Sequence, residues 1–439
     1  MIILQAPASK SVSHRMIIAA SLARGTSTVH HALASADLER TRDILVSVGS
    51  SMTDLGNGSW EVQGMPHGPE GGNDSPVDCF VSESGTTCRL LTAVLASGRG
   101  MFRIFGVPRM HERPIGALTD ALRALGADIR FENKDGYPPM IVSTQGLRGG
   151  DVSLSIDASS QYLSGMLLAA PFCKEALRIT LAGSKIVSWP YVGLTLQVLE
   201  DFGIGFLVEQ LQDGVWNAVP WRSLTSVRPG ELRITVYPGE YRAGEYQVEG
   251  DWSGASYLLA AGAVGQSPVL VTGLRADSIQ GDRAMLDILK AMGANIEIHD
   301  DGILVSPSAL HGITVDMGAC PDLVPTVAMA AAFAEGVTRI HNVAHLRIKE
   351  CDRLSACASE LARIGIKTEE TADTLTIYGV GPATPVVPAG TVFNTYNDHR
   401  LAMCVSLLGL APGNEVVVDD PAVVRKSFPE FWNVWSALR

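Results

Sequence analysis

The stretch SKSVSHRMIIAASLA, residues 9–23, sets the pattern that decides the fold. A short island of Ser, Lys and Arg stands directly before RMIIAASLA (15–23), which is apolar nearly all round a helix. A helix of that composition is buried. Its polar start predicts a helix N-terminus whose free N–H groups and partial positive charge can bind an anion.

The same pattern recurs about every 70 to 95 residues. The polar islands contain Ser11, Gly85, Ser159, Ser253, Asp322 and Asp398. A second set of positions keeps the same spacing, each a Gly that ends an amphipathic helix: Gly49, Gly126, Gly203, Gly293 and Gly365. Hairpins follow, as in ANIEIHDDGILVS (294–306), where apolar residues alternate around a turn. We therefore predict six repeats of the type βαβαββ.

These repeats predict an α/β (α+β) protein of two globular domains, each with three repeats around buried central helices, an inverted α/β arrangement. The longer step before Ser253 indicates an insertion in residues 215–233. The sixth repeat lacks a strand, and IILQA (2–6) is expected to close it. The domains are then 1–8 with 251–439, and 9–250. The active site is expected in the cleft between them.

Composition restricts the function. The chain has 439 residues and a formal net charge of −12, which argues against general nucleic-acid binding. Its seven Cys show no CxxC and no metal-ligand spacing, so reduced thiols and no metal site are expected. The first residues lack the charged start and apolar length of a signal peptide, and no apolar run could span a bilayer. A cytoplasmic protein that binds neither membranes nor nucleic acid is expected.

Basic residues cluster near the islands, in SKSVSHR, PRMHERP (108–114), LRIKECDR (346–353), NDHR (397–400) and VRKSFP (424–429). Each island alone could be an ordinary helix cap. Glu350 and Arg353 could be a solvated ion pair on one helix face, and His399 could be structural. Six islands in register with Lys and Arg beside several of them favour a strongly anionic ligand set instead.

At this point the chain resembles the 5-enolpyruvylshikimate-3-phosphate synthase family of enolpyruvyl transferases. SKSVSHR is similar to that family's SKSxSxR, and SGTTCRLL (84–91) to its AGTxxR segment. Further similar segments follow in order: RMHERPIG, SSQYL, SWPYVGLTL, PDLVPT, IKECDRL, TYNDHRLAM and DPAVVRKSFP. The resemblance runs from residue 6 to residue 433. It implies the same fold of two halves with three repeats each.

The resemblance implies a transferase of the shikimate pathway, which leads to chorismate and the aromatic amino acids. The enzyme moves the enolpyruvyl group of phosphoenolpyruvate to the 5-hydroxyl of shikimate 3-phosphate, and phosphate leaves. Addition and elimination need a general acid and a general base. By resemblance Glu350 is the acid that protonates the methylene carbon, and Asp322 is the base, with Lys10 as a possible helper.

The resemblance also implies two binding sets. The phosphoenolpyruvate set is Lys10, Gly85, Arg113, Gln161, Arg353, Arg400 and Lys426. The shikimate-phosphate set is Lys10, Ser11, Arg15, Ser159, Ser160, Gln161, Ser188, Tyr191, Asp322, His345 and Lys349. No metal and no organic cofactor is implied, the partners are the two small substrates, and a monomer is expected. Glyphosate, the inhibitor of this family, is expected to bind beside Gly85.

Three residues depart from the family pattern, because Glu83, His345 and His14 stand where Asn is common. Glu83 puts a carboxylate near the expected anion. Alternatives are a sister enzyme that acts on UDP-N-acetylglucosamine, an RNA 3′-phosphate cyclase type, and a binding module without activity. The first lacks SKSxSxR and SSQY, the second needs a nucleotide site, and the third would have lost Asp322, Glu350 or Lys10.

Overall fold

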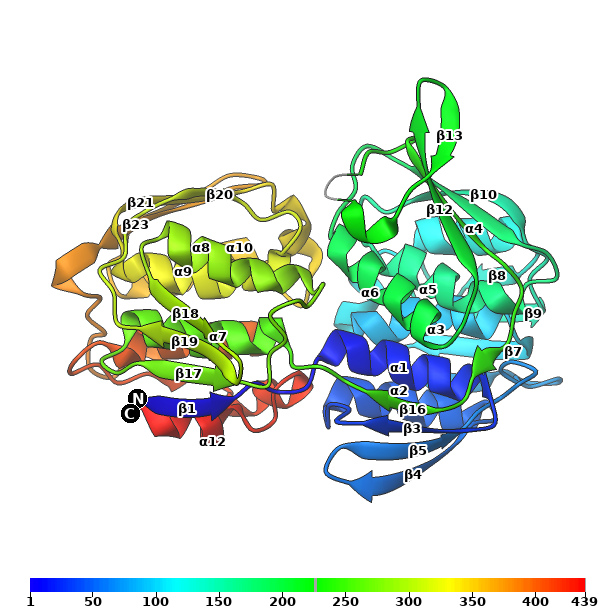
Figure 1. The fold of residues 1–439 in the computed structure, drawn as a ribbon, viewed down its shortest axis with the longest axis horizontal. Helices are drawn as coiled ribbons and strands as arrows, with labels where there is room; N and C mark the ends of the chain where they lie inside the picture. Colours follow the sequence, from blue (N-terminus) through cyan, green and yellow to red (C-terminus); the bar gives the residue numbers. More distant parts are fainter. Residues whose placement is uncertain (225–226, 439) are drawn as a thin grey trace. The chain divides into compact units, whose positions relative to one another are not determined.

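The computed structural model describes residues 1–224 and 227–438, and its contacts divide the chain into two compact units (Figure 1). The first unit combines Met1–Ser9 with Glu249–Arg439, and the second is Lys10–Val248. We call them the split unit and the continuous unit. No helix in the described residues is both long and apolar enough to cross a membrane.

The continuous unit contains three repeats. Repeat one consists of β16 (Glu245–Gln247), α1 (Lys10–Leu22), β3 (Thr26–His30), α2 (Ala36–Ser47), β4 (Ser51–Gly56) and β5 (Ser59–Gln63). Repeat two consists of β6 (Val77–Phe80), α3 (Gly85–Ala96), β7 (Arg99–Phe105), α4 (Gly116–Ala124), β8 (Asp128–Phe131) and β9 (Met140–Gln145). Repeat three consists of β10 (Gly150–Ser155), α5 (Gln161–Ala169), β11 (Leu177–Ala182), α6 (Trp189–Asp201), β12 (Phe206–Gln212), β13 (Val215–Ala218) and β14 (Leu232–Val236). A short pair, β2 (Ala23–Arg24) with β15 (Tyr241–Arg242), lies outside these sheets.

The split unit contains the other three. Repeat four consists of β1 (Ile2–Gln5), α7 (Trp252–Val264), β17 (Val269–Thr272), α8 (Met285–Ala291), β18 (Asn295–His299) and β19 (Gly302–Ser306). Repeat five consists of β20 (Thr314–Asp316), α9 (Val324–Phe333), β21 (Glu335–His341), α10 (Arg353–Arg363), β22 (Thr368–Glu370) and β23 (Leu375–Val380). Repeat six is shorter, with β24 (Val392–Phe393), α11 (His399–Val405), β25 (Val417–Val418) and α12 (Phe431–Trp435).

The four-stranded sheets share one order, in which the first strand pairs parallel with the second and a hairpin completes the sheet. In repeat two the order is β6-β7-β9-β8, with Val77 opposite Phe102 in the parallel pair and Phe102 opposite Val142 in the antiparallel one. Repeats one, four and five have the same order. Repeat three adds β13 at its edge, inside the insertion expected at 215–233, of which Thr225 and Ser226 lie outside the described residues.

The strand β1 corrects one prediction. It pairs parallel with β17, Ile2 opposite Val269, and therefore completes repeat four rather than repeat six. In the same way β16 pairs parallel with β3 and completes repeat one. In each of these repeats the first strand pairs with the second. The two strands next to the points where the chain passes between the units, β1 and β16, both act as such a first strand. Among the residues that the structure describes, repeat six instead has the two-stranded pair β24-β25.

The central helices are buried, as their all-apolar composition predicted. Every residue of α9 is buried, and α7, α9 and α11 contribute Ala255, Met329 and Leu401 to one apolar core. The polar islands lie where these helices begin. Ser84, Asp251 and Asp398 are N-caps whose side chains accept backbone N–H groups of α3, α7 and α11. The core thus fixes the helices while their charged starts remain at its border.

Gly49, at the end of α2, has φ of 122°. A left-handed residue at this place lets the chain leave the helix and enter the hairpin, and glycine adopts it without a Cβ penalty. The four other glycines predicted to end helices also have positive φ: Gly126, Gly203, Gly293 and Gly365.

Candidate functional site

The start of α1 carries an ion pair. Lys10 is the first residue of the helix, and its Nζ contacts Oδ2 of Asp37 in the first turn of α2. Their side chains are only 14% and 6% exposed. Ser11 follows on α1 and is partly exposed. A shielded lysine beside a carboxylate can hold a substrate anion and exchange a proton with it.

Arg15 is a buried cation with neutral partners. It is 2% exposed, and its Nε donates to Thr195 Oγ1 at 2.7 Å. Its other hydrogen bonds go to Ser11 O, Ser164 Oγ and Tyr191 O. Burial lowers the pKa of Arg15 to about 10. No described carboxylate lies within ion-pair distance of it, so an anionic ligand would supply the missing negative charge.

The start of α3 lies against an arginine. Gly85 is its first residue, and a Cβ added there would lie 2.5 Å from a terminal nitrogen of Arg113. Arg113 is 5% exposed, and its Nη1 donates to Glu83 O at 3.0 Å. The absence of a side chain at Gly85 therefore allows the guanidinium to lie on the helix terminus. Glu83, which stands where Asn is common in the family, contacts Arg113 through its backbone oxygen.

Gln161 connects the starts of α5 and α3. Its Nε2 donates to Thr86 Oγ1 at 2.9 Å, and its Oε1 accepts from Arg89 Nη1 at 2.9 Å. Ser159 Oγ accepts the backbone N–H of Gln161 at 3.2 Å, and Ser160, the N-cap, is buried. Hydroxyl and amide groups thus surround two adjacent helix N-termini.

Ser188 and Tyr191 lie at the start of α6. Ser188 is its buried N-cap and has φ of 52°, a strained conformation for a residue with a side chain. Strain of this kind is common at functional sites. Tyr191 is half-buried, and its backbone oxygen accepts from Arg15.

His14 is fully buried, and its Nδ1 lies 2.9 Å from Thr41 Oγ1. Burial, together with the charge of Lys10, lowers the pKa of His14 to about 3. The imidazole is therefore neutral at physiological pH and acts as a structural hydrogen-bonding group, much as an amide would.

In the split unit, Arg353 joins three carboxylates. It is 1% exposed and starts α10. Its guanidinium donates to Asp398 at 2.7 Å, to Asp322 at 2.8 Å and to Glu350 at 2.9 Å. Burial would lower the pKa of Arg353, but the three carboxylates raise it well above its usual value. These ion pairs hold together the starts of α9, α10 and α11.

Asp322 lies between two arginines. It stands in a 3-10 turn, η5 (Pro321–Leu323), before α9, and its other oxygen accepts from Arg400 Nη2 at 2.8 Å. Burial would raise the pKa of Asp322, but Arg400, Lys349 and Arg353 outweigh burial and hold that pKa well below its usual range. Asp322 is a carboxylate at physiological pH and a weak base as long as both arginines pair with it.

Glu350 lies between two cations. Its Oε2 accepts from Arg353, and its Oε1 lies 3.5 Å from Lys426 Nζ. Lys426 is 5% exposed and ends the 3-10 helix η9 (Pro421–Lys426). The carboxyl group itself is 12% exposed. A carboxyl group so placed can exchange a proton with a bound substrate and is oriented by both cations.

Two further predicted residues, His345 and Lys349, lie in the segment directly before Glu350. His345 is 6% exposed in the 3-10 helix η6 (Ala344–Ile348). Lys349 directly follows it and is half-buried, and its charge acts on Asp322.

The structure thus brings Asp322, Glu350, Arg353, Arg400 and Lys426 together in one network of ion pairs. The predicted residues from Lys10 to Tyr191 all belong to the continuous unit. Two carboxyl groups, Asp37 and Asp282, were missed by the sequence reasoning, and both are buried beside these cations. The only sequence signal was their position next to a basic island or a helix start. Asp398 was predicted as part of a polar island but was given no role in the site, where it pairs with Arg353.

Metal binding has no support in the described residues, where no three His, Cys, Asp or Glu side chains are grouped to hold an ion. Positive charge at the predicted site residues, both in the continuous unit and in the split unit, comes from Lys and Arg.

Comparison with known proteins identifies the family. The model of the family described as EPSP synthase (3-phosphoshikimate 1-carboxyvinyltransferase) matches residues 2–220 and 224–435. The chain belongs to the EPSP synthase family. It is therefore an enzyme, a transferase.

Known proteins are similar to this chain in sequence or in structure over nearly its whole length. The 3-phosphoshikimate 1-carboxyvinyltransferase of Shewanella amazonensis is 41% identical over 434 residues, which are 98% of this chain and 95% of that protein. The enzyme of the same name from Aeromonas salmonicida is 40% identical and covers 97% and 94%. A solved EPSP synthase from Acinetobacter baumannii has a TM-score of 0.78 at 26% identity, over 99% and 95% of the chains. The enolpyruvyl transferase NikO of Streptomyces tendae, at 17% identity and a TM-score of 0.73, shares the fold.

Proposed function

We propose that this enzyme transfers the enolpyruvyl group of phosphoenolpyruvate to the 5-hydroxyl of shikimate 3-phosphate and releases phosphate. The observation that carries this function is the network in which Arg353 and Arg400 hold Asp322 while Arg353 and Lys426 hold Glu350. It supplies two carboxyl groups for proton transfer and several cations for anionic substrates. The family supports the same reaction.

The substrates together carry two phosphates and two carboxylates, so binding is mainly a matter of charge. We assign the phosphoenolpyruvate set and the shikimate-phosphate set to the two substrates as the resemblance implies. Arg15 supports the assignment for the sugar phosphate, because it is a buried cation whose partners among the described residues are all neutral. The two sets include residues of both units, so the proposal requires both units to bind the same substrate pair.

In the addition step the 5-oxygen of shikimate 3-phosphate forms a bond to carbon 2 of phosphoenolpyruvate. The hydroxyl proton goes to Asp322, and carbon 3 takes a proton from Glu350. Elimination then returns the carbon 3 proton to Glu350, breaks the bond from carbon 2 to the phosphate oxygen, and passes the proton held on Asp322 to the departing phosphate. Protons and bonds balance over the two steps, and the fixed geometry of both carboxyl groups reduces the entropic part of the barrier.

Asp322 must become a better base when substrate is bound. In the free enzyme Arg400 and Arg353 lower its pKa, which favours the carboxylate but weakens it as a base. A substrate carboxylate that binds these arginines would draw their hydrogen bonds away. The pKa of Asp322 would then rise, so that substrate binding itself activates the base. Lys10 is the second candidate for this proton, since Asp37 shields and orients it.

We further propose a monomeric enzyme of the cytoplasm, without a metal or organic cofactor and without a nucleic-acid or membrane partner. The described cysteines are free thiols, and six of the seven are buried, in agreement with a reducing compartment.

The test is release of phosphate from phosphoenolpyruvate with shikimate 3-phosphate as acceptor. We expect turnover with this acceptor and none with UDP-N-acetylglucosamine. A protein that bound both substrates in calorimetry but released no phosphate would be a binding module, and the proposed reaction would be wrong.

A further inference from the structure

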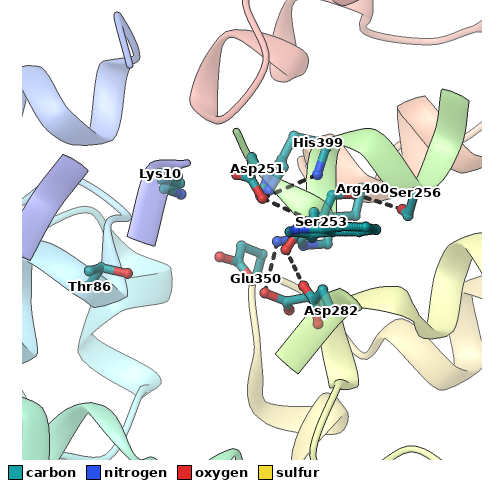
Figure 2. A network of polar contacts seen from close by, with 12 residues as sticks. Lys10, Thr86, Asp251, Ser253, Ser256, Asp282, Glu350, His399 and Arg400 are labelled. Carbon is teal, nitrogen blue, oxygen red and sulfur yellow. Dashed lines mark hydrogen bonds and ion pairs between the residues drawn. The ribbon is translucent and has the colours of Figure 1, made fainter. Parts of the chain in front are cut away.

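A fourth carboxyl group lies beside the network and has no role in the steps above. Asp282 is 2% exposed and belongs to the 3-10 turn η4 (Gly281–Ala284). Ser253, in the first turn of α7, donates a hydrogen bond from its Oγ to Asp282 Oδ2 (Figure 2). The helix position of Ser253 is fixed in turn, because its backbone N–H donates to Asp251 Oδ1 at 2.8 Å.

Several charged groups surround Asp282. Asp322 from η5 and Asp251 from the N-terminus of α7 oppose its ionisation, while Arg400 from α11 favours it. The charge of Asp282 also contributes to the raised pKa of the nearby Cys320 thiol, whose main cause is burial. Other charges on the packed elements point elsewhere: Arg283 donates to Ala276 O, and Asp287 and Lys290 of α8 are exposed. Burial, the strongest influence, raises the pKa of Asp282 to about 7.

The protonation of Asp282 decides the net charge of this group of residues. The ion-paired network and the neighbouring Lys349 contain four cations and three carboxylates, Arg353, Arg400, Lys426 and Lys349 with Asp322, Glu350 and Asp398, and the carboxylate of Asp251 also acts on Asp282. Ionisation of Asp282 adds one more negative charge to these residues.

We propose that Asp282 is a positioning residue that sets the charge of the Asp322–Arg400 pair, and so the affinity of the split unit for an anionic substrate group. This inference rests on the proposed function. A neutral Asp282 does not compete for Arg400, whose Nη2 donates to Asp322 and which can also bind the incoming anion. An ionised Asp282 would compete with that anion for Arg400 and repel it.

Two variants and a matched control test the proposal. Asp282→Asn keeps the size and removes the titration. Ser253→Ala removes a hydrogen bond that lowers the pKa of Asp282, so ionisation should shift to higher pH. Asp287→Asn makes the same chemical change at an exposed carboxyl on the neighbouring helix and should behave as wild type. Circular dichroism and melting temperature establish that each variant is folded.

The first measurement is a pH titration of the free enzyme by difference infrared spectroscopy, which detects protonated carboxyl groups. We expect a band that disappears as pH passes about 7 in the wild type, is missing in Asp282→Asn, and persists to higher pH in Ser253→Ala. A folded Asp282→Asn protein with the same band as wild type would overturn the charge assignment.

The second measurement is KM for phosphoenolpyruvate and kcat between pH 5.5 and 9. Relative to Asp282→Asn, the wild-type KM should rise about tenfold across neutral pH, as expected for one charge near the ligand, while kcat changes less. Titration of the substrate phosphate is common to all variants and cancels in the ratio. Identical KM curves for wild type and Asp282→Asn would overturn the proposal. A normal infrared titration in an enzyme without turnover would instead overturn the proposed function and leave the assignment of the titrating group intact.

Discussion

Replacement of Gly85 by Ala tests the contact between the start of α3 and Arg113. An ideal Cβ at Gly85 would lie 2.5 Å from Arg113 Nη2, 2.8 Å from its Cζ and 2.9 Å from its Nη1. All three distances are below the contact distance of a carbon atom. The guanidinium must therefore move by roughly 0.5 to 1 Å, since the backbone of a buried helix start cannot. That movement disturbs the 3.0 Å hydrogen bond from Arg113 to Glu83 O.

The size of the effect follows from overpacking, which costs about 1–3 kcal/mol. The neighbour that must move is the end of a long side chain, so the lower half of this range applies. A loss of about 1–2 kcal/mol raises KM for phosphoenolpyruvate roughly 5- to 30-fold. If the site is as proposed, glyphosate, the longer ligand, would meet the new methyl directly as well. We expect its inhibition constant to rise at least about tenfold more than that KM.

The assay is glyphosate inhibition at varied phosphoenolpyruvate in wild type, Gly85→Ala and Gly116→Ala. Inhibition of the wild type should be competitive with phosphoenolpyruvate. Gly116 also starts a helix, α4, but a Cβ there meets its nearest neighbour at 3.4 Å, an ordinary contact. That variant should keep wild-type KM and inhibition.

Two results would refute the reasoning. Equal losses of substrate and inhibitor in Gly85→Ala would mean that the methyl acts only by moving Arg113 and does not exclude the longer ligand. Unchanged binding of both would mean that Gly85 does not line the site. A cycle with Arg113→Lys separates the two effects, because changes that act through the same side chain are not additive.

Glu350→Gln should lower kcat about 10² to 10⁴-fold and spare KM, because Gln still accepts from Arg353 but cannot donate a catalytic proton; near-normal turnover would contradict the acid assignment. Lys426→Ala should raise KM for phosphoenolpyruvate roughly 10- to 100-fold, whereas Lys367→Ala, at a lysine 64% exposed, should not; equal kinetics of the two variants would remove Lys426 from the site. For Asp282 a raised pKa means that its contribution to stability is present below about pH 4 and lost as pH rises to about 7. Asp282→Asn should therefore raise the melting temperature more at pH 8 than at pH 5, and the opposite order would contradict burial of a titrating carboxyl group.

The helix starts were predictable from sequence because each depends on local chemistry. Ser84 and Asp398 cap the helices that their positions in the islands indicated. The partner of β1 was not predictable in this way. The spacing of the islands predicts the number of repeats. It does not predict which repeat β1 completes, because that depends on which sheet offers an open edge for a parallel strand, here the edge at Val269 of β17.

The site divides similarly. The basic residues were visible because Lys and Arg are conspicuous in short islands. Asp37 and Asp282 were not, because the sequence around them looks like an ordinary helix start and an ordinary turn. Their importance comes from burial beside cations, which only the packing of α2 against α1, and of η4 against α7, produces.

Arg15 and Arg353 are both buried, yet they are prepared for opposite tasks. Arg353 already holds three carboxylates, so a substrate anion gains from it only by competing with them. Arg15 holds none of the described carboxylates, and its desolvation is compensated only by neutral oxygens. An anion that reaches Arg15 therefore gains nearly the full Coulomb attraction, which suits tight binding. In the mechanism proposed above, an anion that reaches Arg353 would instead exchange places with Asp322 or Glu350 and release a carboxyl group for proton transfer, which suits catalysis.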